Sequence, residues 1–267
     1  MKFDMKFDQG SLRPQANSTG FLFGIPLRSR AVSRSWAGVT FRFKNTLRSL
    51  LNQRHHDFRI AVACHDIPDL PELSDSRVHI IQANYPAPIY VAEYMVDKTR
   101  KRELIGQHLR ELGGGYLMYV DDDDLVSNRV VEFVRSRPVS HGYIINRGYE
   151  YRSKEKRLQI APRFHRVSGT CAISHWDVND LPLVAFQRER VLFRDVVETS
   201  HAYWEDLFRC MKRPLSLLPF PGAVWVMHEE NVSSTLDLWR WKRKVLRAVI
   251  PYTEITPKLR QEFCLPE

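Results

Sequence analysis

The sequence predicts an α/β fold in which helices flank a mainly parallel central sheet, and three observations support this prediction. Short apolar runs alternate with longer helical patterns throughout the first half of the chain. The last of these runs, "YLMYV" (116–120), directly follows a helical pattern that ends on glycines. The second half then changes to the alternating pattern of a hairpin, which adds a small antiparallel part. With 267 residues, 43% of them hydrophobic, the chain can bury one large core.

In the first half, the pattern favours a β-α-β order. Between 97 and 112, Ile105, Leu109 and Leu112 fall on one helical face, and the glycines from Gly113 onward end the helix. The expected strands are 20–27, 58–64, 77–81 and 116–120, and the expected helices are 35–54 and 97–112.

The second half is predicted to start with a helix that begins near Ser127 and ends before Pro138. Pro219 and Pro221 interrupt an otherwise strand-like stretch, "LSLLPFPGAVWVMHEEN". A basic C-terminal helix is expected because Trp239 and Leu246 recur near helical spacing. The other expected elements are a hairpin or meander at 142–160, a strand at 168–174, and helices at 200–213 and 235–250.

Composition narrows the classes of function. Lys and Arg (40) exceed Asp and Glu (31), giving a net charge of +9 that favours nucleotide phosphates, nucleic acid or an anionic membrane surface as partners. The four cysteines form no CxxC pair, which argues against a zinc knuckle or a disulfide framework. Because there is no apolar signal core and no apolar run of about 20 residues, we expect a cytoplasmic protein.

Four consecutive aspartates, Asp121 to Asp124, follow the apolar run 116–120. Adjacent carboxylates repel one another, so a folded protein tolerates them when they face water or hold a cation. Mg²⁺ and Mn²⁺ prefer oxygen ligands, and substrate phosphates often complete their coordination. The carboxyl end of a strand is also where open α/β sheets bind ligands. A metal site and a solvated acidic turn both fit the run, and its position favours the metal site.

The stretch "YLMYVDDDDLVSNRVVEF" resembles the acidic strand-end motif of GT-A-fold glycosyltransferases of the family-2-like type, which act on bacterial polysaccharides or glycolipids. The resemblance implies a GT-A-like, Rossmann-like fold and covers roughly residues 20 to 235. It implies that Asp121 lies near the nucleotide ribose and that Asp123 is the main metal ligand, with Asp124 beside it. Asp122, also on the nucleotide side, would be a spacer that a neutral residue could replace.

The same resemblance implies a nucleotide-binding first half. "FLFGIPLRSR" and "FRIAVACHD" are similar to its opening unit, and "DKTRKRELIG" occupies the place of a basic helix against the nucleotide. An ordinary solvated helix face is the alternative for these cations. The implied nucleotide contacts are Pro26, Arg28, Arg30, Asp66, Lys98 and Arg102.

The second half adds a carboxylate pair in "AYWEDLF" and a histidine in "AVWVMHEEN". By resemblance, Asp206 or Glu205 is the general base that deprotonates the acceptor, and His228 completes the metal shell. His201 competes for the role of base. The pair here follows Trp204, where the family has a glycine. Ordinary helix N-terminal charges and a hydrogen-bonded strand-end histidine are the structural alternatives.

The stretch "RFHRVSGTCAI" occupies the place of an acceptor-side or diphosphate-side wall, and a basic surface strand is the equally plausible alternative. Its cations and hydroxyls can hydrogen-bond phosphate, and its glycine lets a sugar approach the backbone. The candidates there are Arg163, His165, Ser168, Gly169 and Thr170.

The sequence therefore predicts a flexible N-terminus (1–19), a catalytic domain (20–233) with nucleotide-binding (20–125) and acceptor (126–233) halves, and a basic helical extension (234–267). The predicted function is an inverting glycosyltransferase that uses Mn²⁺ or Mg²⁺ and a nucleotide-sugar, with a saccharide or lipid-linked acceptor. Tryptophans among the cations at 235–250 fit peripheral attachment to an anionic membrane; a helix that packs Trp239 on the core and exposes its charges is the alternative. A Mg²⁺-dependent phosphate-ester hydrolase or nuclease and a non-enzymatic nucleic-acid-binding protein are the rival predictions; nucleic acid is the less expected partner.

Overall fold

A seven-stranded sheet, in the order β10-β6-β9-β4-β1-β2-β3, forms the centre of the computed structural model. The structure describes residues 20–186, 191–228 and 250–266. β1, β2, β3 and β4 are parallel neighbours, whereas β9 runs antiparallel between β4 and β6. The strands are β1 (Phe21–Pro26), β2 (Arg59–Cys64), β3 (Val78–Gln82), β4 (Gly115–Tyr119), β6 (Gly142–Ile144), β9 (Ala172–Trp176) and β10 (Ser216–Leu217).

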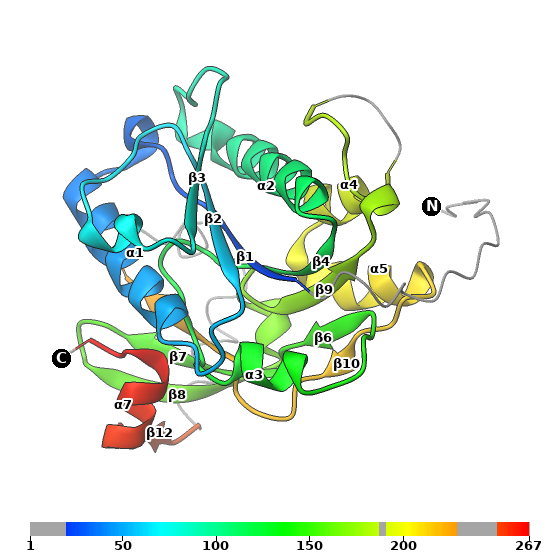
Figure 1. Cartoon of the computed structure of the whole chain (residues 1–267). Helices are drawn as coiled ribbons and strands as arrows, with labels where there is room; N and C mark the ends of the chain where they lie inside the picture. Colours follow the sequence, from blue (N-terminus) through cyan, green and yellow to red (C-terminus); the bar gives the residue numbers. More distant parts are fainter. Residues whose placement is uncertain (1–19, 187–190, 229–249, 267) are drawn as a thin grey trace.

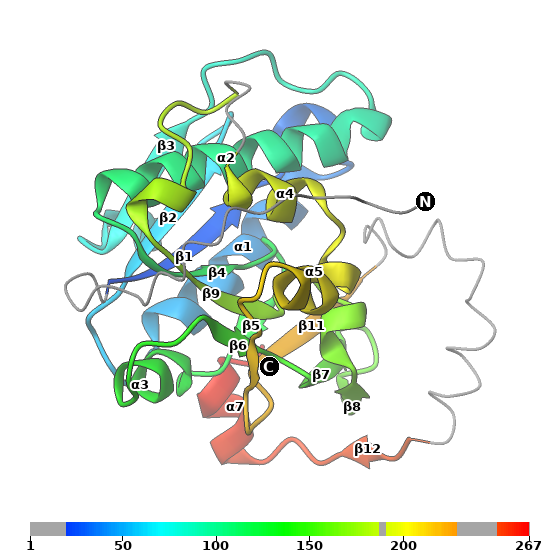
Figure 2. The same cartoon turned by 90° about the vertical axis from the view of Figure 1, so that its right-hand side faces the viewer.

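Helices cover both faces of this sheet. Figures 1 and 2 show α1 and α2 on opposite faces, with α4 and α5 on the same side as α2. β1 is buried along its whole length because it is covered on both faces, which explains its continuous apolar sequence. The helices are α1 (Trp36–Leu51), α2 (Tyr94–Glu111), α3 (Val130–Arg135), α4 (Leu192–Glu198), α5 (Trp204–Cys210) and α7 (Pro257–Phe263).

A second sheet of five strands, in the order β12-β8-β7-β11-β5, packs beside the first. Its β7 and β8 form the antiparallel hairpin expected from the sequence. Phe263 of α7 is fully buried in the core of this part, together with Tyr151 and Leu158. The strands are β5 (Leu125–Val126), β7 (Arg147–Arg152), β8 (Arg157–Pro162), β11 (Ala223–Met227) and β12 (Tyr252–Thr253).

The prediction of a mixed α/β fold with a mostly parallel central sheet is confirmed. The helix expected at 200–213 is shorter and is preceded by a 3-10 turn, His201–Tyr203. Of the predicted C-terminal extension (234–267), residues 234–249 and 267 lie outside the described residues, whereas 250–266 contribute β12 and α7 to the second sheet and its core. The predicted flexible N-terminus, 1–19, also lies outside the described residues.

The aspartate run joins the two sheets. It leaves β4 of the first sheet and enters β5 of the second, which pairs with β11. The turn is closed by a hydrogen bond from the Asp124 N–H to the Asp121 carbonyl. The four carboxylates therefore lie where the carboxyl end of a central parallel strand meets the second sheet.

Within the described ranges, no helix combines the length and apolar character that a bilayer crossing requires.

Candidate functional site

Asp121 is held by the cations of α2. Its carboxylate lies 2.6 Å from the Lys98 ammonium, and its backbone N–H donates to the Thr170 hydroxyl. Burial alone would raise the pKa of Asp121, but Lys98 and Arg102 outweigh it and lower the pKa to about 2. Asp121 is therefore ionised at neutral pH.

Asp123 faces His228, which lies at the end of β11. The His228 Nε2 is 2.7 Å from the Asp123 Oδ2, and both side chains are only slightly exposed. The described residues contain no group of three or more His, Cys, Asp or Glu side chains able to hold a metal ion. Mg²⁺ and Mn²⁺ commonly take one or two protein ligands and complete their shell with substrate phosphates and water. The Asp123–His228 pair fits such a substrate-completed ion rather than a metal centre made by protein side chains alone.

Asp124 and Asp122 have other hydrogen-bond partners. Asp124 is fully buried, and its carboxylate accepts hydrogen bonds from the hydroxyls of Ser168 and Thr170 and from the Val226 N–H. Burial, reinforced by repulsion from Asp123 and Asp121, raises its pKa well above the usual range. Asp124 thus fastens residues 168–170 to the aspartate run and lies beneath the surface where a metal was expected.

Asp122 accepts the Arg28 backbone N–H at 2.9 Å. Burial, followed by repulsion from Asp123, raises its pKa. Asp122 connects the loop after β1 to the aspartate run, and a neutral acceptor could make the same hydrogen bond.

A cavity of about 390 Å³ opens between α2, the aspartate run and the segment after α4. Asp121 and Asp123 share it with the cations of α2 and of the loop after β1. Eight residues predicted from the sequence line it: Arg28, Lys98, Arg102, Asp121, Asp123, Ser168, Gly169 and His201. The other lining residues are Tyr94, Met95, Thr99, Val167, Val197, Glu198, Thr199, Ser200 and Trp225.

Aromatic rings fix the cations of the cavity wall. The Arg102 guanidinium lies over the rings of both Tyr119 and Trp204, 5.2 and 5.3 Å from their centroids. The Trp204 indole N–H donates to the Val196 carbonyl at 2.9 Å, which holds the ring in place. The tryptophan that stands where a glycine was expected therefore orients a cavity cation.

Gly169 lies against the same charges. A Cβ there would be 3.1 Å from the Asp121 carboxylate and 3.2 Å from the Arg102 guanidinium. The absence of a side chain lets residues 168–170 approach the aspartate run closely, as their hydrogen bonds to Asp124 require.

The structure separates the three candidates for the base. Glu205 and Asp206 are not among the described residues that line the cavity; they lie in the first turn of α5 and pair with Arg209 at 3.2 and 3.0 Å. Their position indicates helix N-terminal charges with local partners. Glu205 also lies 3.4 Å from His165.

His201 does line the cavity, as does Glu198, which the sequence did not indicate as a site residue. Burial lowers the pKa of His201 to about 4; Asp121 opposes this shift, and repulsion from Lys98 and Arg102 adds to it. The imidazole is therefore neutral at pH 7 and can accept a proton. No motif in the sequence indicated Glu198, because it belongs to no pair or regularly spaced group of acidic residues.

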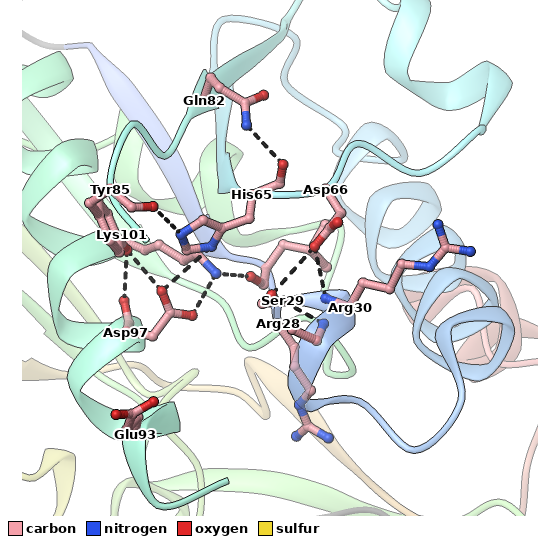
Figure 3. Close-up of polar contacts among 12 residues, drawn as sticks. Arg28, Ser29, Arg30, His65, Asp66, Gln82, Tyr85, Glu93, Asp97 and Lys101 are labelled. Atoms are coloured by element: carbon pink, nitrogen blue, oxygen red, sulfur yellow. Dashed lines mark hydrogen bonds and ion pairs between the residues drawn. The ribbon is translucent and has the colours of Figure 1, made fainter. Parts of the chain in front are cut away.

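The remaining predicted contacts lie away from the cavity. Asp66 accepts the Arg30 N–H at 2.9 Å and faces Ser29, so it holds the loop after β1, as Figure 3 shows. Pro26 is the buried last residue of β1. Arg163 is exposed and has a left-handed backbone conformation, and His165 is buried beside Glu205. Burial lowers the pKa of His165 despite that carboxylate.

A second group of charges lies behind the loop after β1. The Lys101 ammonium donates to Asp97 at 2.6 Å and to the Leu27 carbonyl at 2.7 Å. Asp97 also accepts the Tyr85 hydroxyl, and its carboxylate lies 3.7 Å from His65. Figure 3 shows these side chains converging from the ends of β1 and β2 and from the segment after β3 onto α2.

No protein-family model matches this chain, and no curated protein sequence matches it significantly.

Proposed function

We propose that this chain is a metal-dependent glycosyltransferase with a GT-A-like fold, moving a sugar from a nucleotide-sugar donor to a hydroxyl of a saccharide or lipid-linked acceptor. One observation carries the proposal: Asp121 and Asp123 share a cavity with Lys98 and Arg102 at the carboxyl end of β4. This edge of a parallel sheet is where α/β proteins bind ligands. Cations beside carboxylates suit a diphosphate that arrives with a divalent metal.

Asp123 and His228 would hold Mn²⁺ or Mg²⁺, and the ion would supply Lewis-acid stabilisation of the departing diphosphate. Lys98 and Arg102 would add positive charge on the same side of the cavity. Asp121, ionised and fixed by Lys98, would accept a hydrogen bond from the nucleotide ribose. We place this activity in the cytoplasm.

Asp123→Asn tests the metal assignment. We expect it to abolish the Mn²⁺-dependent thermal stabilisation of the protein by nucleotide-sugars, because the amide is a neutral and weaker metal ligand. Asp122→Asn is the matched control, since an amide oxygen can still accept the Arg28 N–H. Unchanged metal-dependent donor binding in Asp123→Asn would show that the metal assignment is wrong. Filter binding to RNA and DNA tests the nucleic-acid rival on the same samples.

The proton of the acceptor hydroxyl would pass to a group that lines the cavity, either His201 or Glu198. Loss of a general base typically lowers the rate about 10²-fold to 10⁴-fold. We expect that loss in kcat for Glu198→Gln or His201→Gln, and a kcat close to wild type for Asp206→Asn. A large loss in Asp206→Asn alone would restore the base expected from the sequence. A product with retained anomeric configuration would rule out single displacement.

A further inference from the structure

Five apolar side chains on the segment before α2 and on its first turn are exposed to solvent. Ile89, Tyr90 and Val91 are consecutive and are 75, 67 and 66% exposed, and Met95 and Val96 follow at 54 and 56%. Isolated exposed apolar residues are common, but a contiguous group is typical of an interaction surface. We call these five residues the apolar rim.

The structure holds the apolar rim in a defined conformation. The Glu93 carboxylate accepts the backbone N–H groups of Ile89 and Tyr90, at 2.7 and 3.2 Å. Just before the rim, the Tyr85 hydroxyl donates to Asp97 at 2.9 Å. The loop thus presents its apolar side chains outward at little additional cost in conformational entropy on binding.

The apolar rim borders the candidate site. Met95 belongs to the rim and also lines the cavity that contains Asp121 and Asp123. In Figure 1 the loop before α2 extends from the edge of the molecule beyond the end of β3. A surface that covers the rim would therefore lie at the cavity mouth.

We propose that the apolar rim inserts into the interface of an anionic lipid bilayer and brings the cavity to a lipid-linked acceptor. A projecting loop with tyrosine between two aliphatic residues suits a deformable interface, because tyrosine places an apolar ring and a polar hydroxyl at the headgroup level. Arg100, one helical turn after Val96, is exposed and stacks on Tyr85 at 5.3 Å. The net charge of +9 complements anionic headgroups and opposes self-association. The lipid-linked acceptor rests on the proposed function, whereas bilayer binding does not.

Vesicle co-sedimentation of the full chain, without nucleotide or metal, tests the proposal. We expect binding to vesicles of phosphatidylcholine with phosphatidylglycerol, and weaker binding to phosphatidylcholine alone. Ile89→Ser/Tyr90→Ser should raise the lipid concentration for half-binding by about tenfold, because the variant transfers less apolar surface from water to the bilayer. The matched control is Phe41→Ser/Leu217→Ser, which removes two apolar residues with similar exposure, 61 and 60%, from other elements. This control should bind like the wild type.

Three results would overturn the proposal: no binding by the wild type, equal binding by the two double variants, or a wild-type dimer in sedimentation equilibrium that the rim variant abolishes. Ile89→Trp gives a second readout at an exposed position, and its added fluorescence should shift to the blue on vesicles; no added shift would also contradict insertion. Since the assay needs no donor, its failure leaves the glycosyltransferase proposal intact, and the donor-binding test can fail independently of it.

Discussion

Helix α2 makes two carboxylate–ammonium pairs on adjacent faces, and the two pairs differ in their surroundings. Asp97 and Lys101 are four residues apart, their side chains are 4 and 1% exposed, and they face the loops after β1, β2 and β3. Lys98, one position further round the helix, pairs with Asp121, and their side chains are 11 and 21% exposed at the cavity. Both pairs have an N–O distance of 2.6 Å.

The two pairs have different roles: one stabilises the loops near the site, and the other forms part of the candidate site. The Asp97–Lys101 pair has its hydrogen bonds completed by Tyr85 and the Leu27 carbonyl, so it ties the loops after β3 and β1 to α2. The Lys98–Asp121 pair lies in a cavity with room for further ligands. The same two chemical groups therefore stabilise loops in the Asp97–Lys101 pair and form a candidate binding surface in the Lys98–Asp121 pair.

The largest effect that we predict is on the buried pair. Lys101→Met leaves the Asp97 charge buried without its cation, which typically costs about 3–5 kcal/mol of the free energy of unfolding. Urea denaturation measures this loss. The double variant Lys101→Met/Asp97→Asn should recover part of it, because the uncompensated charge is gone. A loss below about 1 kcal/mol, the range of a surface ion pair, would place this pair in the same class as exposed ones.

A smaller loss of stability is expected on the cavity side. In Lys98→Met, Asp121 retains Arg102 nearby and an opening to water, so the unfolding free energy should fall less than in Lys101→Met. Donor affinity should instead fall by about tenfold or more, the usual value of one hydrogen bond between charged groups. Calorimetric titration with a donor found by thermal shift measures the change. If Lys98→Met lost stability but kept donor affinity, the Lys98–Asp121 pair would be structural, like the Asp97–Lys101 pair.

The sequence predicted the fold class because the β-α-β pattern is local: each run of 116–120 or 58–64 is buried by its neighbours on both faces. It also placed the aspartate run correctly at the end of a strand. The separate roles of the four aspartates could not be predicted, because their partners come from distant segments. His228 lies 105 residues from Asp123, and Ser168 lies 44 from Asp124.

The candidates for the base differ in what the sequence could reveal about their position. Glu205 and Asp206 match the position that the family resemblance implies for the base, but Arg209 lies four and three residues after them on the same helix and pairs with both. That local pattern was visible in the sequence and favoured the structural alternative. Glu198 carries no such pattern, and only the packing of α4 against α2 brings it to the cavity.

A third predicted effect concerns the pH dependence of stability on the cavity side. The pKa of His201 is about 4 in the folded protein and 6.5 as the ordinary value, so between these pH values the unfolded chain binds a proton that the folded protein does not. His201 therefore lowers the unfolding free energy as the pH falls from 6.5 towards 4. His201→Gln removes this proton, so the stability of the wild type relative to the variant should decline across that window. Urea denaturation at several pH values between 7 and 4 measures the difference. If the difference in unfolding free energy between the wild type and His201→Gln did not change with pH, His201 would not be desolvated by the cavity wall. The cavity would then be more open to water than the Lys98–Asp121 contact indicates.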